Sequence, residues 1–161
     1  MQVGKAIVAG LMGAMAMTAV LAVARILGSP VNLGEMLGSM ITGELDSASW
    51  LVGFALHLLA GAGFALAYAA MFEYSAHRAS AGVGALYGLG HAVLSGLMLG
   101  AVPLLHPLVP DELPEPGLLL SGHGALGVLL FAGVHVLYGA VVGSMYAPVK
   151  AEHRRALRAL P

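Results

Sequence analysis

The 161-residue chain contains no cysteine and few charged side chains. The absence of cysteine excludes disulfides, iron–sulfur ligation and thiol nucleophiles. Charged residues make up 9% of the chain and hydrophobic residues 59%, with a mean hydropathy of +0.89, whereas about 25% of residues are charged in a soluble domain. The composition therefore excludes an ordinary soluble domain and predicts a membrane protein surrounded by the lipid bilayer.

Other absences exclude two further classes of function. The formal net charge is −1 and no basic stripe follows the chain, so the sequence offers no surface for nucleic acid. No Asp or Glu lies inside a predicted membrane span, and no nucleophile with its base, phosphate-binding loop or carboxylate pair is recognisable. We therefore predict that the protein is not an enzyme.

Four apolar segments are each long enough to cross the hydrocarbon core as a helix of about 20 residues. They cover residues 4–27, 50–72, 82–105 and 119–145, the last with an alternative start near Leu126. Backbone polar groups find no partners in lipid, so these segments must be helices. The predicted fold is all-α: an integral membrane four-helix bundle. A single domain covers residues 1–148, and a basic tail over 149–161 contacts anionic headgroups.

Charge in the short connections predicts the orientation. Basic residues lie at the start of the first segment, between the second and third, and in the tail: Lys5, Arg78, Lys150, Arg154, Arg155 and Arg158. The two opposite connections are acidic and contain Glu35, Glu44, Asp46, Asp111, Glu112 and Glu115. Because basic loops stay on the cytoplasmic side, both termini are predicted to be cytoplasmic.

A stretch of the second segment is repeated in the fourth. Residues 57–69 read HLLAGAGFALAYA and residues 135–147 read HVLYGAVVGSMYA. The histidine, glycine and tyrosine that coincide lie on one helix face. The same spacing aligns the first segment with the third and divides the chain into repeat halves 4–72 and 82–150. Since both halves enter the membrane from the same side, we predict two helical hairpins related by an axis along the membrane normal.

The first outer connection, residues 29–49, is too long for a simple turn. Asn32 followed by Glu35 resembles an N-cap with its capping box, and apolar residues then recur at helical spacing. We therefore predict a short helix there, on the outer surface.

The second outer connection, residues 106–117, contains four prolines and is predicted to be irregular. His106 begins this connection and His123 follows it. Both histidines are expected to lie at the membrane interface, where a polar tip reaches water.

Small residues recur at every fourth position in all four segments. In the second and fourth segments these ridges include Gly61 and Gly139, each one turn after a histidine. Because such ridges let membrane helices approach closely, the predicted partners are other membrane-protein subunits or further copies of the chain.

Histidines inside the spans are the candidate binding residues, because an ionisable side chain in an apolar helix normally faces the bundle interior. His57 and His135 are predicted to lie at equal depth and to face each other. With Gly61 and Gly139 leaving room for a flat macrocycle, they form a candidate axial pair for haem b. Together with His91 they form a candidate Cu or Zn site. The alternatives are neutral structural histidines hydrogen-bonded within the bundle, and a proton or ion path.

These motifs resemble those of a family of small bacterial four-helix membrane proteins. The shared features are Gly4-Lys5 with Ala9-Gly10, the Met36/Met40 segment, and the H-x-x-x-G motifs His57/Gly61 and His135/Gly139. The resemblance implies the four-helix fold and a bacterial inner-membrane location, and it implies no established activity. The predicted function is a non-enzymatic accessory or scaffold subunit of a larger membrane complex. The alternative is a haem b- or metal-binding electron-transfer protein that uses the paired histidines.

Overall fold

The computed structural model describes residues 1–146, and these residues form helices joined by short connections. In chain order the elements are α1 (Val3–Ile26), α2 (Leu33–Thr42), α3 (Ser47–Tyr74), α4 (Ala81–Gly100), α5 (Val102–Leu105), the 3-10 helix η1 (Leu118–His123) and α6 (Gly124–Met145). The described part of the chain contains no strand, which confirms the predicted all-α class. The predicted tail over 149–161 and the end of the second repeat half lie outside the described residues.

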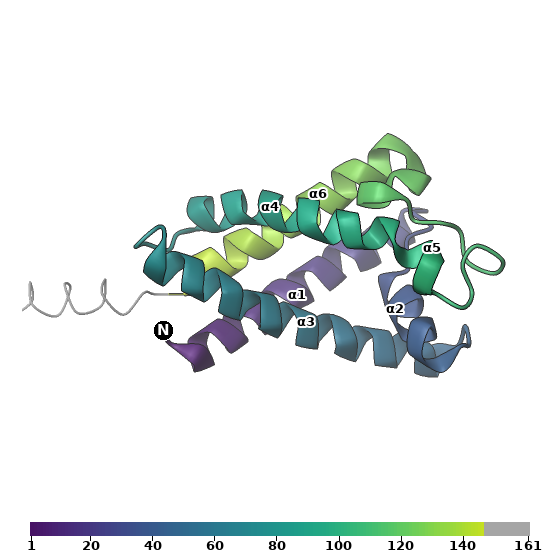
Figure 1. Cartoon of the computed structure of the whole chain (residues 1–161), viewed down its shortest axis with the longest axis horizontal. Helices are drawn as coiled ribbons and strands as arrows, with labels where there is room; N and C mark the ends of the chain where they lie inside the picture. Colours follow the sequence, from purple (N-terminus) through teal and green to yellow (C-terminus); the bar gives the residue numbers. More distant parts are fainter. Residues whose placement is uncertain (147–161) are drawn as a thin grey trace, which may run out of the picture.

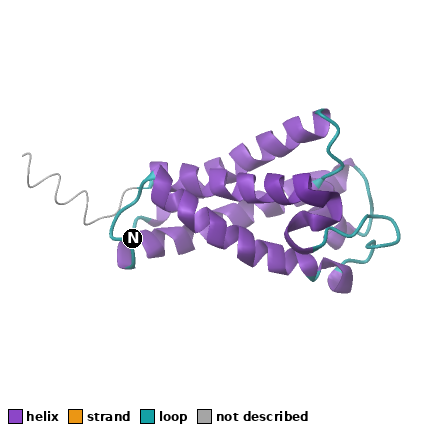
Figure 2. Ribbon diagram, turned by 90° about the horizontal axis from the view of Figure 1, so that it is seen from above, coloured by secondary structure: helices purple, strands orange, loops and turns teal. Residues whose placement is uncertain are grey.

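Four helices are long and apolar enough to cross a membrane, as predicted: α1, α3, α4 and the stretch from η1 through α6. They run along the longest dimension of the molecule (Figure 1), and Figure 2 shows the same arrangement from above. One end carries the N-terminus and the α3–α4 turn, and we call it the N-terminal end. The opposite end carries α2 and α5, and we call it the α2 end.

Local signals set the helix starts. The Asn32 side chain accepts a hydrogen bond from the Glu35 amide, so the predicted N-cap is present at α2. Glu35 reaches back to the side-chain amide of Asn32 (2.6 Å), which is a variant of the predicted capping box. Asp46 caps α3 by accepting from the Ser49 amide (2.7 Å), and Ser80 caps α4 in the same way. The Ser49 amide holds the pKa of the exposed Asp46 carboxyl below its usual value.

The third apolar segment does not form the single helix predicted over residues 82–105. α4 ends at Gly100, and Pro103 lies in the first turn of the separate short helix α5. Proline lacks a backbone N–H and clashes with the preceding turn, so it favours a new helix start over continuation. The prediction was wrong in its last turn for this reason.

The fourth apolar segment begins with an irregular turn. Leu119 and Leu120 have positive φ angles of 53° and 66°, and the regular helix α6 begins at Gly124. Its start therefore lies close to the alternative start at Leu126. Residues 106–117 are irregular, as predicted.

The long helices pack in pairs through glycine. α1 lies against α3 and α6, while α4 lies against α6. The Gly61 carbonyl fills the space that a Cβ on Gly10 would need, and the backbones of Gly84 and Gly139 approach each other in the same manner between α4 and α6. The predicted small-residue ridges therefore contact one another inside the chain.

The short helix α2 is docked on α3 rather than lying free on the surface. The Ser49 carbonyl occupies the space beside Gly38, and the Gly34 carbonyl occupies the space beside Gly53. Glycine at both crossing points allows α2 to close the α2 end of the molecule.

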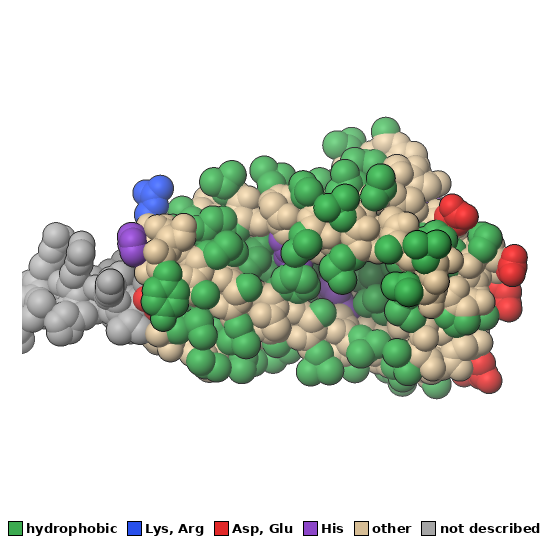
Figure 3. All heavy atoms as spheres, in the orientation of Figure 1, with side chains coloured by type: hydrophobic (Ala, Val, Ile, Leu, Met, Phe, Trp, Pro, Cys, Tyr) green, Lys and Arg blue, Asp and Glu red, His purple; other side chains and the backbone are tan. Residues whose placement is uncertain are grey.

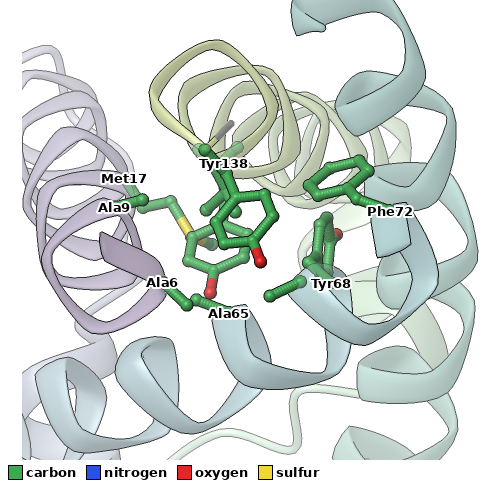
Figure 4. Close-up of a cluster of buried hydrophobic side chains, with 11 residues drawn as sticks. Ala6, Ala9, Met17, Ala65, Tyr68, Phe72 and Tyr138 are labelled. Carbon is green, nitrogen blue, oxygen red and sulfur yellow. The ribbon is translucent and has the colours of Figure 1, made fainter. Parts of the chain in front are cut away.

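Two clusters of buried side chains form the core. The first, shown in Figure 4, combines the rings of Tyr68, Phe72 and Tyr138 with small residues of α1 and α3. The rings of Tyr68 and Tyr138 meet edge-on with centroids 5.5 Å apart. The second cluster lies toward the α2 end and contains Val31, Leu99, Val102, Val109 and Leu120. Side chains of both clusters line the cavity described next.

Candidate functional site

A cavity of ≈ 440 Å³ lies between α1, α2, α3, α4 and α6. This volume is typical of small-molecule pockets. Its walls are mostly apolar and include Met17, Leu21, Met36, Phe64, Leu99, Phe131 and Val134. Three imidazoles enter this apolar cavity from three different helices: His57 from α3, His91 from α4 and His135 from α6.

His135 is buried (6% exposed), and its Nδ1 lies 2.7 Å from the carbonyl oxygen of Phe131, one turn earlier in α6. A carbonyl oxygen only accepts hydrogen bonds, so Nδ1 carries the proton and donates it. In the neutral ring, Nε2 is then a hydrogen-bond acceptor with a free lone pair. The Phe131 ring packs on the imidazole at a centroid distance of 4.3 Å.

The Nε2 atom of His57 is buried and has no hydrogen-bond partner among the described residues. The same ring interacts with the backbone of Ala14 in α1 and lies within electrostatic range of His135. A buried polar group that is left unsatisfied costs about 1–3 kcal/mol. The atom has almost no surface open to the cavity, so a ligand or a water molecule reaches it only after the ring turns.

His91 completes the group on α4. Its Nδ1 lies 3.4 Å from the Tyr68 hydroxyl, and its ring meets the His135 ring edge-on with centroids 4.9 Å apart. The equivalent position in the first half is Gly13, where the Tyr138 ring occupies the space that a side chain would need. The third imidazole therefore exists in one half only.

Four of the five predicted site residues line the cavity: His57, Gly61, His91 and His135. Gly139 does not, because the Gly84 backbone occupies the space beside it. The room that we expected there for a flat macrocycle is filled by α4. Within residues 1–146, no three His, Asp or Glu side chains are grouped so as to hold a metal ion, so the geometry lends no support to the Cu or Zn site.

Tyr138 is a site residue that the sequence analysis did not identify. Its hydroxyl donates to the Gly61 carbonyl and links α6 to α3, and its ring lies 5.4 Å from that of His91. The equivalent residue in the first half is Ala60, which has no hydroxyl, so a comparison of the two repeat halves does not single out Tyr138. The available signal was a lone tyrosine beside the H-x-x-x-G motif, because a buried tyrosine hydroxyl requires a partner.

A second polar cluster lies at the N-terminal end, where α3 continues beyond its predicted limit. Glu73 is buried (7% exposed) and accepts a hydrogen bond from the Tyr146 hydroxyl at 2.8 Å. That hydroxyl also accepts from the Gln2 amide at 3.0 Å. Burial raises the pKa of Tyr146 to about 12, so the hydroxyl stays protonated at neutral pH. The cluster joins the ends of α1, α3 and α6.

His106 is buried (4% exposed) instead of lying at the interface as expected. Its Nδ1 accepts from the Leu108 amide at 3.1 Å, so its Nε2 carries the proton of the neutral ring and donates to the Met36 carbonyl at 2.8 Å. The Ser39 hydroxyl lies 3.3 Å from the same Nε2. The imidazole therefore joins the 106–117 connection to α2, and its polar atoms are satisfied by protein groups.

Comparison with known proteins adds no assignment to this geometry. No family model, curated protein or solved structure matches the chain. The family resemblance that the Gly4-Lys5, Met36/Met40 and H-x-x-x-G motifs suggest stays a prediction. The function therefore follows from the cavity and its histidines.

Proposed function

We propose that this protein spans a membrane and binds a ligand in the cavity, against His57, His91 and His135. The observation that carries the proposal is the convergence of three imidazoles in one apolar cavity, with Nε2 of His57 buried and unpartnered among the described residues. Polar groups in apolar surroundings are costly, and ionisable residues inside membrane helices normally serve a function. The proposed function is binding, without a catalytic step.

The surface supports insertion into a membrane. Figure 3 shows acidic side chains gathered at the α2 end, a basic side chain at the N-terminal end, and apolar side chains between them. Lys5 and Arg78 lie at the ends of helices that meet the N-terminal end, whereas Arg25 lies in the last turn of α1 near the α2 end. On this balance the positive-inside rule favours an orientation with the N-terminal end in the cytoplasm. The bacterial inner-membrane location that we propose rests on the family resemblance of the motifs.

The helix order supports the predicted duplication. α1 and α4 both begin at the N-terminal end, and each packs against its long partner, α3 or α6, through glycine contacts. Two hairpins that start from the same side agree with a parallel repeat about an axis along the membrane normal.

Haem b between His57 and His135 is the cofactor that the sequence motif suggests. The α4 backbone beside Gly139 counts against it, because it fills the room expected for the macrocycle, and one feature favours it. The His135 ring donates Nδ1–H to a backbone carbonyl, and the His57 ring interacts with the Ala14 backbone while its Nε2 has no partner among the described residues. Histidines that ligate metals typically engage their second nitrogen in this way. A bound haem would supply electron transfer.

An accessory subunit of a larger membrane complex is the second candidate. The small-residue ridges that suggested it are used within the chain, but Gly63, Gly90 and Gly133 face open space and would admit a partner helix. In native membrane extracts, an accessory subunit migrates in a complex larger than the chain. Migration of the chain alone contradicts this role.

The binding function is tested on protein purified in mild detergent. An absorption spectrum, elemental analysis and mass spectrometry of extracted small molecules are compared for the wild type, His57→Ala and His77→Asn. His77 is the matched control because it is exposed in the α3–α4 turn, and asparagine tolerates its positive φ of 54°. We expect a bound species in the wild type and in the control, and its loss in His57→Ala. A species retained equally in all three proteins contradicts the proposed site.

A further inference from the structure

The cavity opens on the side of the molecule, between α3 and α4. These helices pack on α1 and α6 and not along each other. Toward the N-terminal end, aromatic rings close the gap between α3 and α4. The ring centroid of Tyr87 in α4 lies 6.0 Å from that of Tyr68 and 5.4 Å from that of Phe72, both in α3. Nearer the α2 end, Figure 3 shows a hollow on this face in which histidine atoms are visible. In a membrane this side faces the lipid tails, so the opening leads from the bilayer to the imidazoles.

The residues around this opening are small or flexible. Ala60 of α3 and Ser95 and Met98 of α4 line the cavity, and Ala60 and Met98 are exposed. Alanine and serine leave a passage between the helices, and methionine is unbranched and adapts its shape easily.

The polar end of the cavity offers hydrogen-bond acceptors. Nε2 of His135 is an acceptor because its Nδ1 donates to the Phe131 carbonyl. Nε2 of His57 is buried and unpartnered among the described residues, so the ring must turn toward the cavity before this atom meets a ligand. With the ring turned and Nδ1 protonated, the cavity presents two acceptors on α3 and α6, which are complementary to a ligand with two hydroxyl donors.

The surroundings of these acceptors are aromatic and apolar. The ring centroids of Phe64 and His91 are 4.0 Å apart, and those of Phe131 and His135 are 4.3 Å apart. Flat rings stack favourably against such side chains. The rest of the cavity is lined by aliphatic and methionine side chains, which suit a hydrocarbon tail.

From these features we propose that the ligand is a lipid-soluble aromatic diol of the hydroquinone type, which enters from the bilayer between α3 and α4. This inference rests on the proposed binding function and specifies its ligand class. One hydroxyl donates to His57, the other donates to His135, and the tail lies along the apolar wall.

The hydroxyl requirement is tested with 2-decylhydroquinone and its dimethyl ether, by calorimetric titration of purified wild-type protein in detergent. The ether keeps the ring and tail but donates no hydrogen bond, and we expect it to bind at least about tenfold more weakly. His57→Ala is expected to weaken the hydroquinone by about tenfold, with little effect on the ether, and His77→Asn to change neither. The probe comparison uses the wild type, so it does not depend on a variant that folds. Equal affinity of the two probes overturns the proposed ligand class.

The route is tested by closing the gap. The chain has no cysteine, so Ala60→Cys with Ser95→Cys provides two unique sites for a bismaleimide bridge between α3 and α4. We expect the bridge to abolish the hydroquinone association that is measured for the same double variant before bridging. Unchanged association after bridging overturns the lateral route.

The outcomes separate this inference from the proposed function. If the protein carries haem that is lost in His57→Ala and binds neither probe, the diol is wrong and the binding function stands. If no species is bound, and neither the probes nor added haem bind, both proposals fall.

Discussion

The α1–α3 and α4–α6 pairs carry the same H-x-x-x-G motif. The closest contact between the two helices of a pair, however, lies one helical turn further along in one pair than in the other. In the first pair Gly10 faces Gly61. In the second pair Gly88, the equivalent of Gly10, faces the backbone of His135 instead. The repeated sequence therefore yields two hairpins with different register.

Two methyl groups distinguish the first pair at this contact. The closest approach in the second pair is between Gly84 and the α6 glycines Gly139 and Gly143, backbone to backbone. The equivalents of Gly84 and Gly143 in the first half are Ala6 and Ala65, which are both fully buried. Their Cβ atoms prevent the same approach, so α1 makes its close contact one turn further along, at Gly10.

The largest expected difference between the two pairs concerns the motif glycines. A Cβ on Gly139 would meet the Gly84 backbone, whereas a Cβ on Gly61 would first meet the Ala14 methyl at 2.7 Å. We expect Gly139→Ala to lower the free energy of unfolding by about 3 kcal/mol or more and Gly61→Ala by about 2 kcal/mol, because both clashes are with rigid groups and the one at Gly139 is much closer. Denaturant unfolding in detergent, followed by circular dichroism, measures both. Equal losses would mean that the register difference is not real.

The motif tyrosines provide a second, smaller contrast. Tyr146 donates to the buried Glu73 carboxylate at 2.8 Å, whereas the Tyr68 hydroxyl lies 3.4 Å from His91. We expect Tyr146→Phe to lower the free energy of unfolding by about 2 kcal/mol and Tyr68→Phe by less than about 1 kcal/mol, since hydrogen bonds to charged groups are stronger. The same unfolding assay compares them. If Glu73→Gln removes the effect of Tyr146→Phe, the carboxylate is its origin; independent effects would contradict that assignment.

The link made by Tyr138 exists in one half only, because its equivalent is Ala60. Tyr138→Phe removes the hydrogen bond to the Gly61 carbonyl and keeps the ring. We expect a loss of about 1 kcal/mol in the free energy of unfolding. Tyr74→Phe is the matched control, since Tyr74 is exposed. A loss no larger than in this control would show that the carbonyl is satisfied without the hydroxyl.

The smallest contrast concerns the helix starts. Asp46 caps α3, while α6 begins without a side-chain cap. The pKa of Asp46 lies below its ordinary value of 3.8 because of hydrogen bonds from Ser49. The ionised Asp46 side chain therefore stabilises the folded protein at pH values above its ordinary pKa. This stabilisation is lost as the pH falls through the lower pKa of the folded state. Asp46→Asn keeps a capping side chain and is expected to flatten this acid dependence slightly. An identical pH profile in both proteins would assign the dependence to other carboxyls.

Particular residues show how far the site was predictable. His57, His91 and His135 were identified because ionisable side chains are rare in apolar helices, and all three line one cavity. Gly139 was predicted to leave room for a macrocycle, but the Gly84 backbone of α4 fills that room. A glycine in a sequence indicates space beside a helix without indicating which group occupies it. His106 was placed at an interface because its partner, the Met36 carbonyl, is far away in the chain.

The sequence by itself determined the helical class, the four long apolar helices and the α2 N-cap at Asn32. These follow from composition, local periodicity and hydrogen bonds between near neighbours, which are visible along the chain. The tertiary structure alone decided the register of the helix pairs, the burial of His106 against α2, and the opening between α3 and α4. Those features depend on whether one Cβ fits between two backbones and on which side chains meet across the bundle. Such contacts join residues distant in sequence, and no local pattern encodes them.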